Sequence, residues 1–280
     1  MKLASYTIDG KAAFGVVVDD GIVDVTRRLG GRFATLRQAL AAGGLDDIRR
    51  ATAGQAPDHK LADVTFLPVI PDPQRIVCVG INYRSHAEET GRDISPAPSV
   101  FLRLADTLVG HGAALVRPKV SEKFDFEGEL AVVIGRPGRH VSEADALSYV
   151  AGYSCFVDGS VRDYQKFSVT SGKNFPATGP FGPVLVTTDE IPDPTRLTLV
   201  TRLNGREMQR SGTDMLIYSI PKVIKFMSDF TSLAPGDVIA TGTPAGVGHR
   251  RSPPVWMKAG DVLDVEISGI GTLRNPVVDE

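Results

Sequence analysis

The feature that most constrains the fold of this chain is an apolar run, Leu130 to Ile134, which closely follows two glutamates, Glu127 and Glu129. The β-branched composition and the short length of the run predict a buried β-strand. Successive side chains of a strand point to opposite faces, so residues two positions apart share a face. Both carboxylates should therefore point the same way from one end of a core strand. Asp125 faces the same way, either as a further carboxylate of this group or, as we interpret it, at the exposed end of the strand.

A second apolar run, Tyr149 to Val157, also predicts a strand, and it ends at Asp158. If the two strands are neighbours, three carboxylates meet at the end of a buried sheet, which is costly unless a cation neutralises them. An all-oxygen set of ligands suits Mg²⁺ or Mn²⁺ better than zinc, which prefers histidine and cysteine. The same spacing also fits a solvated strand face without a metal, and these residues alone leave both interpretations open.

Strand signals dominate the chain from residue 75 onward, without the regular alternation of strands and helices that is typical of parallel sheets. The first 70 residues show short alternating runs, then two short helical stretches and a proline-rich connector. We predict an α+β, mostly β protein with a small N-terminal α/β domain at residues 1–70 and a mixed-sheet domain at residues 71–280. In the larger domain, Asn204-Gly205 predicts a hairpin turn, and Ser219 predicts the cap of a helix from Pro221 to Phe230.

The charge and hydropathy of the chain exclude several classes of partner. Its 31 Lys and Arg against 33 Asp and Glu give a net charge of −2, and no basic cluster offers a surface for nucleic acid or anionic membranes. No apolar run is long enough to span a bilayer, and the first residues lack the hydrophobic core of a secretory signal. Cys78 and Cys155 lie in strand-like runs, so we expect two buried thiols in a cytoplasmic protein.

His86 and Glu89 lie three positions apart in the segment GINYRSHAEE, which follows a strand-like run. On a helical turn this spacing puts both side chains on one face, where the carboxylate orients the imidazole as a general base requires. An exposed turn with an incidental pair is the alternative, and the spacing alone favours it. We expect solvated side chains for the other histidines, which lie in turn-like segments: His59, His111, His140 and His249.

Several polar residues follow the second strand closely. Arg162, Gln165 and Lys173 offer cationic or amide donors for a carboxylate or a developing enolate, although surface positions explain them equally well. Ser160 and Asp163 match a capping box at a helix start. The later glycine-rich segment TGTPAGVG lets backbone N–H groups approach an anion, but it lacks the lysine of a phosphate loop and the context of a dinucleotide site. We therefore do not expect a bound nucleotide.

Taken in order, these segments resemble the fumarylacetoacetate hydrolase superfamily over about three quarters of the chain, from residue 75 to residue 278. The matching stretches are GINYRSHAEE, FDFEGELAVVIG, VDGSVRDYQ, GKNF, LAPGDVIATGTPAGVG and GDVLDVEISGIGTLRNPV. The resemblance implies a mixed β-sandwich roll as catalytic domain behind the small N-terminal domain, in a protein that usually forms homodimers. It also implies a small anionic oxo acid as the substrate.

The resemblance assigns roles to residues at the matching positions. Glu127, Glu129 and Asp158 look like the ligands of Mg²⁺ or Mn²⁺. His86 and Glu89 look like the dyad that activates water, and Lys173 looks like a catalytic group that holds substrate oxygens. The remaining substrate contacts that it implies are Gln165, Thr243, Arg162 and Tyr83. One departure is Arg103, which stands where the family frequently has lysine.

The reaction that the resemblance implies is metal-dependent hydrolysis of a C–C bond in a β-dicarbonyl acid of the acylpyruvate or fumarylacetoacetate type. The metal would act as a Lewis acid on the enolisable group, His86 would take a proton from water, and Lys173 with Gln165 would stabilise the departing enolate. Decarboxylation of oxaloacetate-like 2-oxo acids and isomerisation of 2-hydroxy-dienedioates would use the same site, and the motifs do not separate these reactions. A Ca²⁺-stabilised β protein and a non-catalytic binding subunit are further alternatives, and the complete set of candidate residues argues against both.

Overall fold

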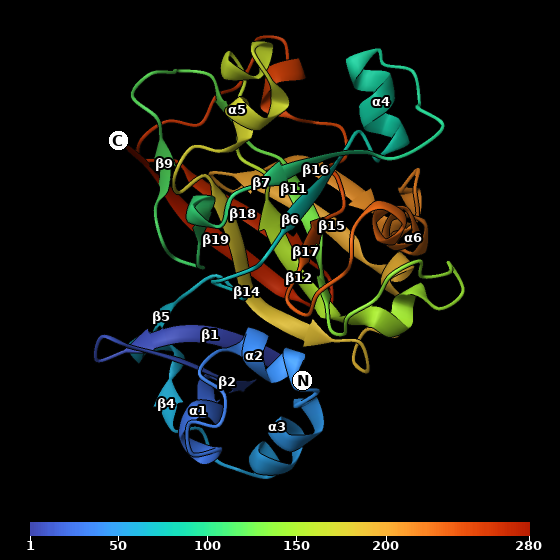
Figure 1. The fold of residues 1–280 in the computed structure, drawn as a ribbon. Coiled ribbons are helices and arrows are strands. Elements are labelled where there is room, and N and C mark those ends of the chain that lie inside the picture. The colour runs from blue at the N-terminus through green and yellow to red at the C-terminus, as the bar shows by residue number, and fades with distance from the viewer.

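The computed structural model describes all residues from Met1 to Glu280, and it shows a smaller N-terminal part against a larger part (Figure 1). The predicted small sheet and two helices of the N-terminal part are present, together with a third, shorter helix. Its elements are β1 (Lys2–Ile8), β2 (Lys11–Val18), β3 (Gly21–Asp24), α1 (Val25–Arg28), α2 (Leu36–Ala41), α3 (Leu45–Thr52), β4 (His59–Lys60) and β5 (Thr65–Phe66).

One long sheet runs through both parts, because β1 pairs antiparallel with a strand of the larger part, β14 (Gly179–Thr187). The division at residue 70 stays a prediction, since the two parts share this sheet. From β14 the sheet continues in the order β12 (Val150–Val157), β11 (Gly128–Ile134), β17 (Val238–Ala240), β6 (Ile76–Gly80) and β7 (Ser99–Arg103). The sheet is mixed, since β17 and β6 are parallel and their neighbours are antiparallel.

A second sheet of five strands packs on one face of the first. Its order is β16 (Arg206–Gly212), β15 (Thr198–Leu203), β18 (Val262–Ile267), β19 (Gly271–Asp279) and β9 (Leu115–Arg117). The hairpin between β15 and β16 turns at Asn204 and Gly205, which both have positive φ as predicted. Two short pairings complete the strands, β8 (Leu108–Val109) with β14 and β10 (Phe124–Asp125) with β13 (Ser160–Val161).

The core shows why the central strands carry apolar runs. Every residue of β11 is buried, and its side chains alternate between two hydrophobic clusters. Leu130 and Val132 belong to the cluster between the two sheets, whereas Ala131 and Val133 belong to the cluster on the opposite face. Burial on both faces needs apolar residues at every position. The mostly β, mixed-sheet sandwich predicted from the sequence is therefore confirmed.

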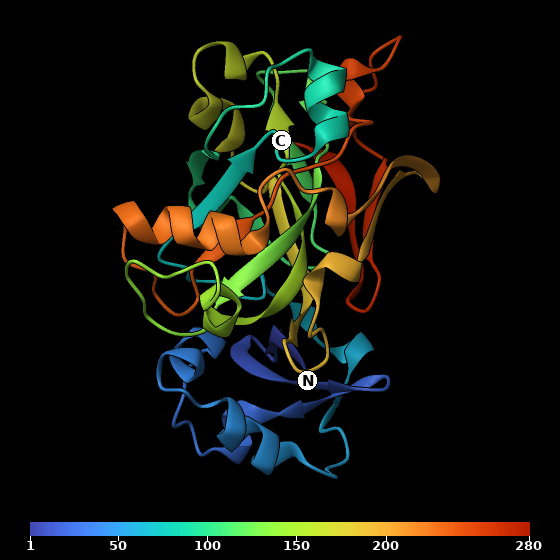
Figure 2. The ribbon, with the colours of Figure 1, turned by 90° about the vertical axis from the view of Figure 1, so that its right-hand side faces the viewer.

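Helices cover the ends and one side of the larger part. α4 (Arg84–Thr90) and α5 (Val169–Lys173) lie above the ends of the central strands, as Figure 1 shows. α6 (Ile220–Phe230) crosses one side of the long sheet (Figure 2), and the Ser219 side chain caps it as predicted. No helix combines the length and the apolar character that crossing a bilayer requires. Single 3₁₀ turns occur at Leu61–Asp63, Ala105–Thr107, Ala146–Tyr149, Tyr164–Lys166, Pro194–Arg196, Thr213–Met215 and Gly248–Arg250.

Both cysteines are free and buried, as the sequence predicted. Cys78 lies on β6 and Cys155 on β12, and the side chains belong to different clusters of the core. Burial raises the pKa of each thiol above its ordinary value. They are structural apolar residues of the core.

Candidate active site

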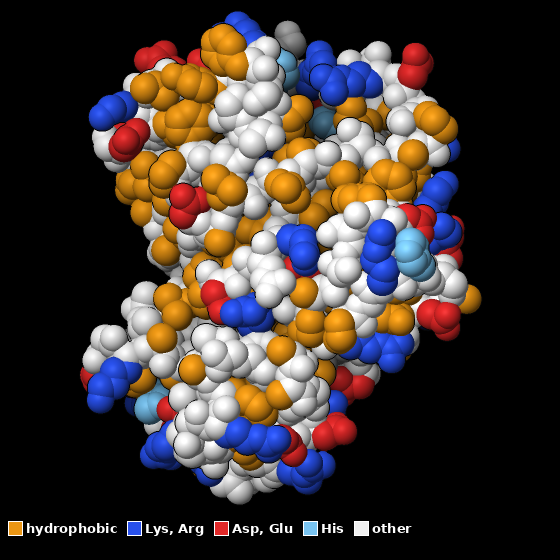
Figure 3. Space-filling model, in the orientation of Figure 1, with side chains coloured by type: hydrophobic (Ala, Val, Ile, Leu, Met, Phe, Trp, Pro, Cys, Tyr) orange, Lys and Arg blue, Asp and Glu red, His pale blue; other side chains and the backbone are white.

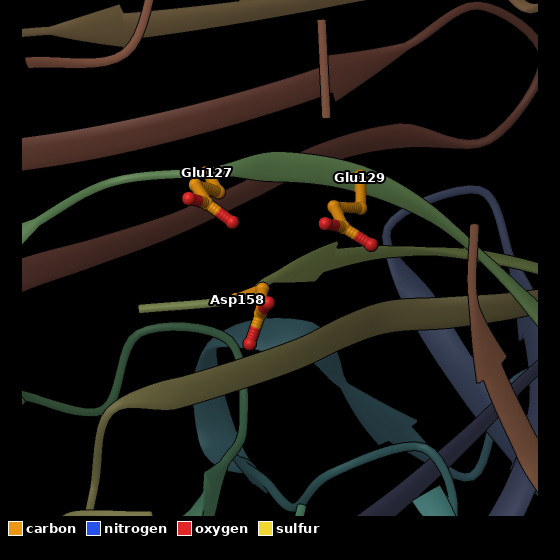
Figure 4. A group of neighbouring side chains, drawn as sticks. All are labelled: Glu127, Glu129 and Asp158. Carbon is orange, nitrogen blue, oxygen red and sulfur yellow. The ribbon is translucent and has the colours of Figure 1, made fainter. Parts of the chain in front are cut away.

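The three acidic residues meet because β11 and β12 are antiparallel neighbours. Gly128 pairs with Val157, which brings the residues just before β11 beside the residue just after β12. The backbone N–H of Asp158 donates to the carbonyl of Glu127 at 2.9 Å. Ligand oxygens of Glu127, Glu129 and Asp158 lie within 4.8 Å of one another, and all three residues are buried (Figure 4). The predicted convergence of three carboxylates is therefore present.

Three cations surround this acidic group, and Lys173 and Arg103 are buried whereas Arg162 is partly buried. Lys173 Nζ lies 2.7 Å from Glu127 Oε2 and 2.5 Å from Asp158 Oδ2. Arg103 Nη1 donates to Asp158 Oδ1 at 2.6 Å, and Arg162 Nη2 lies 2.5 Å from Glu127 Oε1. The protein therefore compensates two of the three carboxylates with its own side chains. Lys173 bridges both of them at the centre of the site.

Glu129 differs from its two neighbours because no cation contacts it. Its only hydrogen bond comes from the backbone N–H of Gly242 at 2.8 Å. Burial, with the charges of Asp158 and Glu127, raises the pKa of Glu129 well above its ordinary value. Burial acts in the same direction on Glu127, but the charges of Lys173 and Arg162 outweigh it and hold the pKa of Glu127 below its ordinary value. One carboxylate of the group thus stays without a compensating charge.

The acidic group fits a hard divalent cation. The ligands of Mg²⁺ at about 2.1 Å lie roughly 3–4 Å apart in an octahedron, a spacing that carboxylate oxygens within 4.8 Å of one another can adopt. All donors are oxygen atoms, which Mg²⁺ and Mn²⁺ prefer. Glu127, Glu129 and Asp158 would hold the ion, and the ion would supply the positive charge that Glu129 lacks.

Binding of Mg²⁺ to the metal-free protein should tighten as the pH rises. A ligand must be deprotonated, and a raised pKa keeps a proton on Glu129 at low pH, so proton and metal compete. The affinity should therefore be weakest at low pH, and binding should release a proton. Calorimetric titrations in two buffers that differ in ionisation enthalpy measure that release. An affinity that is independent of pH, without proton release, would contradict the assignment.

The predicted histidine–glutamate pair lies on α4. His86 Nδ1 and Glu89 Oε2 share a hydrogen bond of 2.9 Å, and the other oxygen of Glu89 accepts from the backbone N–H of Gly246 at 2.8 Å. The carboxylate is thus fixed from two sides, and it fixes the imidazole in turn. This leaves Nε2 of His86 for a substrate. The pair is therefore an oriented dyad in the structure, and the exposed incidental turn is excluded because His86 is buried.

A single cavity of about 380 Å³ connects the dyad to the acidic group. Its lining includes His86, all three acids and Lys173, so an imidazole nitrogen and a cation site face the same space. Other predicted site residues that line it are Arg162, Gln165 and Thr243. This volume is in the range of cavities that bind small metabolites.

Two predicted substrate contacts differ from the others. Tyr83 is fully buried and lies outside the cavity lining, and its hydroxyl has no hydrogen-bond partner. Thr243 lines the cavity, but its hydroxyl donates to the carbonyl of Gly128 at 2.9 Å and accepts from Gln209 Nε2 at 2.8 Å. The hydroxyl hydrogen of Thr243 is therefore already used within the protein.

Two sequence-based interpretations of nearby polar residues are wrong. Asp125 is completely buried rather than exposed at a strand end. Ser160 and Asp163 form no capping box, since Ser160 donates to the carbonyl of Asp158 and Asp163 accepts from Ser121. In both cases a long-range neighbour decided the position, which no local pattern records. His249 is exposed as predicted, and it also lines the cavity and packs against Trp256 with ring centroids 5.7 Å apart.

Asp125 and Gln209 support the site in roles that no local pattern in the sequence indicates. Asp125 accepts from the backbone N–H groups of Gly248 at 2.8 Å and His249 at 3.0 Å, and from Arg162. Gln209, on β16, joins Gly128 to the Thr243 turn through both ends of its amide. Both residues fix the glycine-rich segment beside the acidic group.

Replacing Asp125 with alanine should lower the free energy of unfolding by about 3–5 kcal/mol, because it leaves buried N–H groups and part of the Arg162 charge unpaired. Urea unfolding of the purified variant measures this loss. Asp106→Ala is the matched control, since Asp106 is exposed and has no side-chain partner. A loss no larger than that of the control would show that Asp125 does not hold this segment.

Comparison with known proteins shows to which family this chain belongs. The model of the fumarylacetoacetate (FAA) hydrolase C-terminal family matches residues 75–278, which carry the acidic group, the dyad and Lys173. The chain belongs to the fumarylacetoacetate hydrolase family. Its catalytic part is therefore an enzyme fold of this family, and metal dependence is consistent with both the buried acidic group and the manganese in one solved relative.

Relatives within the family carry different names. A mitochondrial oxaloacetate tautomerase of Homo sapiens is 40% identical over 87% of this chain and 80% of its own length. The solved fumarylacetoacetate hydrolase of Exiguobacterium antarcticum is 36% identical, with a TM-score of 0.88 over 100% of both chains. Maleylpyruvate hydrolase of Sphingobium, solved with manganese and pyruvate, is 28% identical, with a TM-score of 0.85 over 100% of this chain and 99% of its own.

Proposed function

We propose that this protein is a divalent-metal-dependent isomerase that interconverts the enol and keto forms of a 2-oxo dicarboxylic acid of the oxaloacetate type. The observation that carries the proposal is the single cavity shared by the oriented His86–Glu89 dyad and the acidic group. Moving a proton between carbon and solvent needs an oriented acid–base group and a positive site for the oxygen. The tautomerase name of the Homo sapiens relative favours this reaction over others at the same site.

Each residue of the site would have a separate role in this reaction. When bound, Mg²⁺ or Mn²⁺ would supply the positive charge that stabilises the oxygens of the 2-oxo acid. Lys173 and Gln165 would hold the oxygen that carries the enolate charge. His86 Nε2 would donate its proton to carbon 3 while the enol O–H loses its proton to water, which leaves a carbonyl at carbon 2. In the reverse direction the neutral imidazole would take the proton from carbon 3.

Hydrolysis of a C–C bond in an acylpyruvate or fumarylacetoacetate-like acid is the second candidate. The manganese-containing maleylpyruvate hydrolase is the solved relative that favours it. Here His86, oriented by Glu89, would take a proton from water, whose oxygen would bond to the distal carbonyl carbon. The C–C bond would then break, and the fragment would leave as an enolate beside Lys173. Decarboxylation of oxaloacetate would use the same enolate and release carbon dioxide.

Product analysis by proton NMR separates these reactions. The protein with Mg²⁺ or Mn²⁺ is incubated separately with oxaloacetate, maleylpyruvate and a 2-hydroxy-dienedioate. Faster enol–keto exchange of oxaloacetate without loss of carbon supports the proposal. Formation of pyruvate and a second acid from maleylpyruvate, without faster exchange of oxaloacetate, would contradict the proposal and support hydrolysis instead. Buffer with metal and the His86→Ala protein are both needed as controls, because free divalent ions also promote enolisation.

Three further properties follow from the sequence and stay proposals. We propose Mg²⁺ or Mn²⁺ as the bound ion, a homodimer as the assembly and the cytoplasm as the location. Metal analysis of protein purified without chelators would identify the ion. Sedimentation velocity would give the assembly, and a mass equal to one chain would contradict the dimer.

A further inference from the structure

The cavity contains two cations that no acidic side chain of the protein neutralises. Beside the acidic group, Arg162 and Lys173 also line the cavity, and both pair with buried carboxylates. Arg92 and Arg250 line the same cavity, and neither forms an ion pair. Arg250 makes one hydrogen bond, from Nη2 to the carbonyl of Thr90 at 3.2 Å, and the side chain of Arg92 makes none. Figure 3 shows Lys and Arg side chains gathered beside histidine at the top of the molecule, between α4 and α5.

The two arginines come from separate segments whose backbones are held in place. Arg92 follows the last turn of α4, and its N–H donates to the carbonyl of Ala87 at 3.1 Å. Arg250 ends the 3₁₀ turn that buried Asp125 holds through two backbone N–H groups. The hydrogen bond from Arg250 to Thr90 joins the two segments. The backbone of each arginine is therefore held in place beside the same cavity.

The charge near these arginines is positive overall. Asp93 is the one acidic residue that lines the cavity apart from the acidic group, and it forms an ion pair with neither arginine. Partial burial and the charges of Arg162 and Arg250 lower the pKa of His249, which favours its neutral form. Guanidinium is planar, weakly hydrated and matched to the two oxygens of a carboxylate. An anionic group of the ligand is the partner that this arrangement lacks.

We infer that Arg92 and Arg250 form a second carboxylate site, which binds the far carboxylate of a 2-oxo dicarboxylic acid whose oxo-acid end lies at Glu127, Glu129 and Asp158. This inference rests on the proposed function for the position of the oxo-acid end. It makes the two arginines specificity-determining residues: they select diacids over monoacids of the same length. Because both side chains are exposed, the selection should weaken as salt increases.

Binding of unreactive acids to the Mg²⁺-loaded protein tests the inference by calorimetry. Each diacid is paired with the monoacid in which a methyl group replaces the far carboxylate: 2-oxoglutarate with 2-oxopentanoate, and 2-oxoadipate with 2-oxohexanoate. For the better diacid, Arg92→Gln and Arg250→Gln should each weaken binding about tenfold at low ionic strength, as a lost charge-assisted pair does, and the double variant more. Binding of the monoacid should stay unchanged.

Arg84→Gln is the matched control. Arg84 lies on α4, is exposed and has no side-chain partner, but it does not line the cavity, so it changes net charge without touching the proposed site. Equal affinity of wild-type protein for diacid and monoacid, including absence of binding for both, would overturn the inference. So would an equal loss for both acids in the double variant, or an equal loss in the Arg84 variant. In the wild type, the affinity for the diacid should fall more steeply with salt than the affinity for the monoacid.

The binding experiment separates this inference from the proposed reaction. Selective loss of diacid binding without any turnover would support the second carboxylate site and refute the reaction. Turnover of oxaloacetate with unchanged diacid binding in the double variant would do the opposite.

Discussion

Replacing His86 with alanine should lower turnover of the substrate by about 10²–10⁴-fold, which is the usual contribution of a positioned general acid–base group. The imidazole is the one group of the dyad that faces the cavity, and Glu89 orients it from behind. His86 is no ligand of the proposed ion, so Mg²⁺ affinity should change little. Steady-state kinetics and calorimetric titration with Mg²⁺ on the same preparation measure the two quantities.

Two variants sharpen this test. Glu89→Gln keeps a hydrogen bond to His86 but removes the charge, so it should lower turnover less than His86→Ala does and should change the pH profile of turnover. His140→Ala is the control, since His140 is exposed and does not line the cavity. Full activity of the His86 variant would remove the dyad from the mechanism.

Substitution of Glu129 and of Asp158 should have different effects on the stability of the metal-free protein. Glu129→Gln should abolish the Mg²⁺ response without lowering the free energy of unfolding, because it removes a buried carboxylate that no cation neutralises. Asp158→Asn should also abolish the response. It should lower the free energy of unfolding by about 3–5 kcal/mol, because Arg103 and Lys173 each lose the negative charge with which they pair. Both substitutions remove one negative charge, yet they should change the free energy of unfolding by different amounts.

Thermal or urea unfolding with and without Mg²⁺ measures both effects. Wild-type protein should gain stability on addition of Mg²⁺, since an ion that binds the folded state stabilises it by mass action. Neither variant should show this gain. If Glu129→Gln unfolded as easily as Asp158→Asn, the compensation of charge described above would be wrong.

The compensation by Lys173, Arg103 and Arg162 bears on how the site works. A group of three carboxylates without these cations would bind a divalent ion more tightly but would leave less positive charge for a substrate anion. With them, the site would combine a bound ion with three fixed cations. The guanidinium of Arg103 reaches Asp158, the carbonyl of Gly159 and Thr178 together. Lysine could not form this planar set of contacts.

The sequence by itself determined the central strands and the candidate residues of the site. The apolar run after Glu129 and the run before Asp158 predict central strands from local pattern alone. The meeting of the three acids also required these two strands to be neighbours, which the structure shows. The spacing of His86 and Glu89 fixed their contact once the turn was helical. The strands and the contact within the dyad can be predicted because each depends on residues that are only a few positions apart in the sequence.

Only the tertiary structure decided which cation meets which carboxylate. Asp125 and Arg162, or Arg103 and Asp158, are separated by dozens of residues, and their contacts depend on how loops return to the sheet. The same holds for Arg92 and Arg250, which share one cavity although about 160 residues separate them in the chain, as their link through Thr90 shows. A charged side chain looks the same in sequence whether it is solvated or paired, because its state is set by the neighbours that folding supplies.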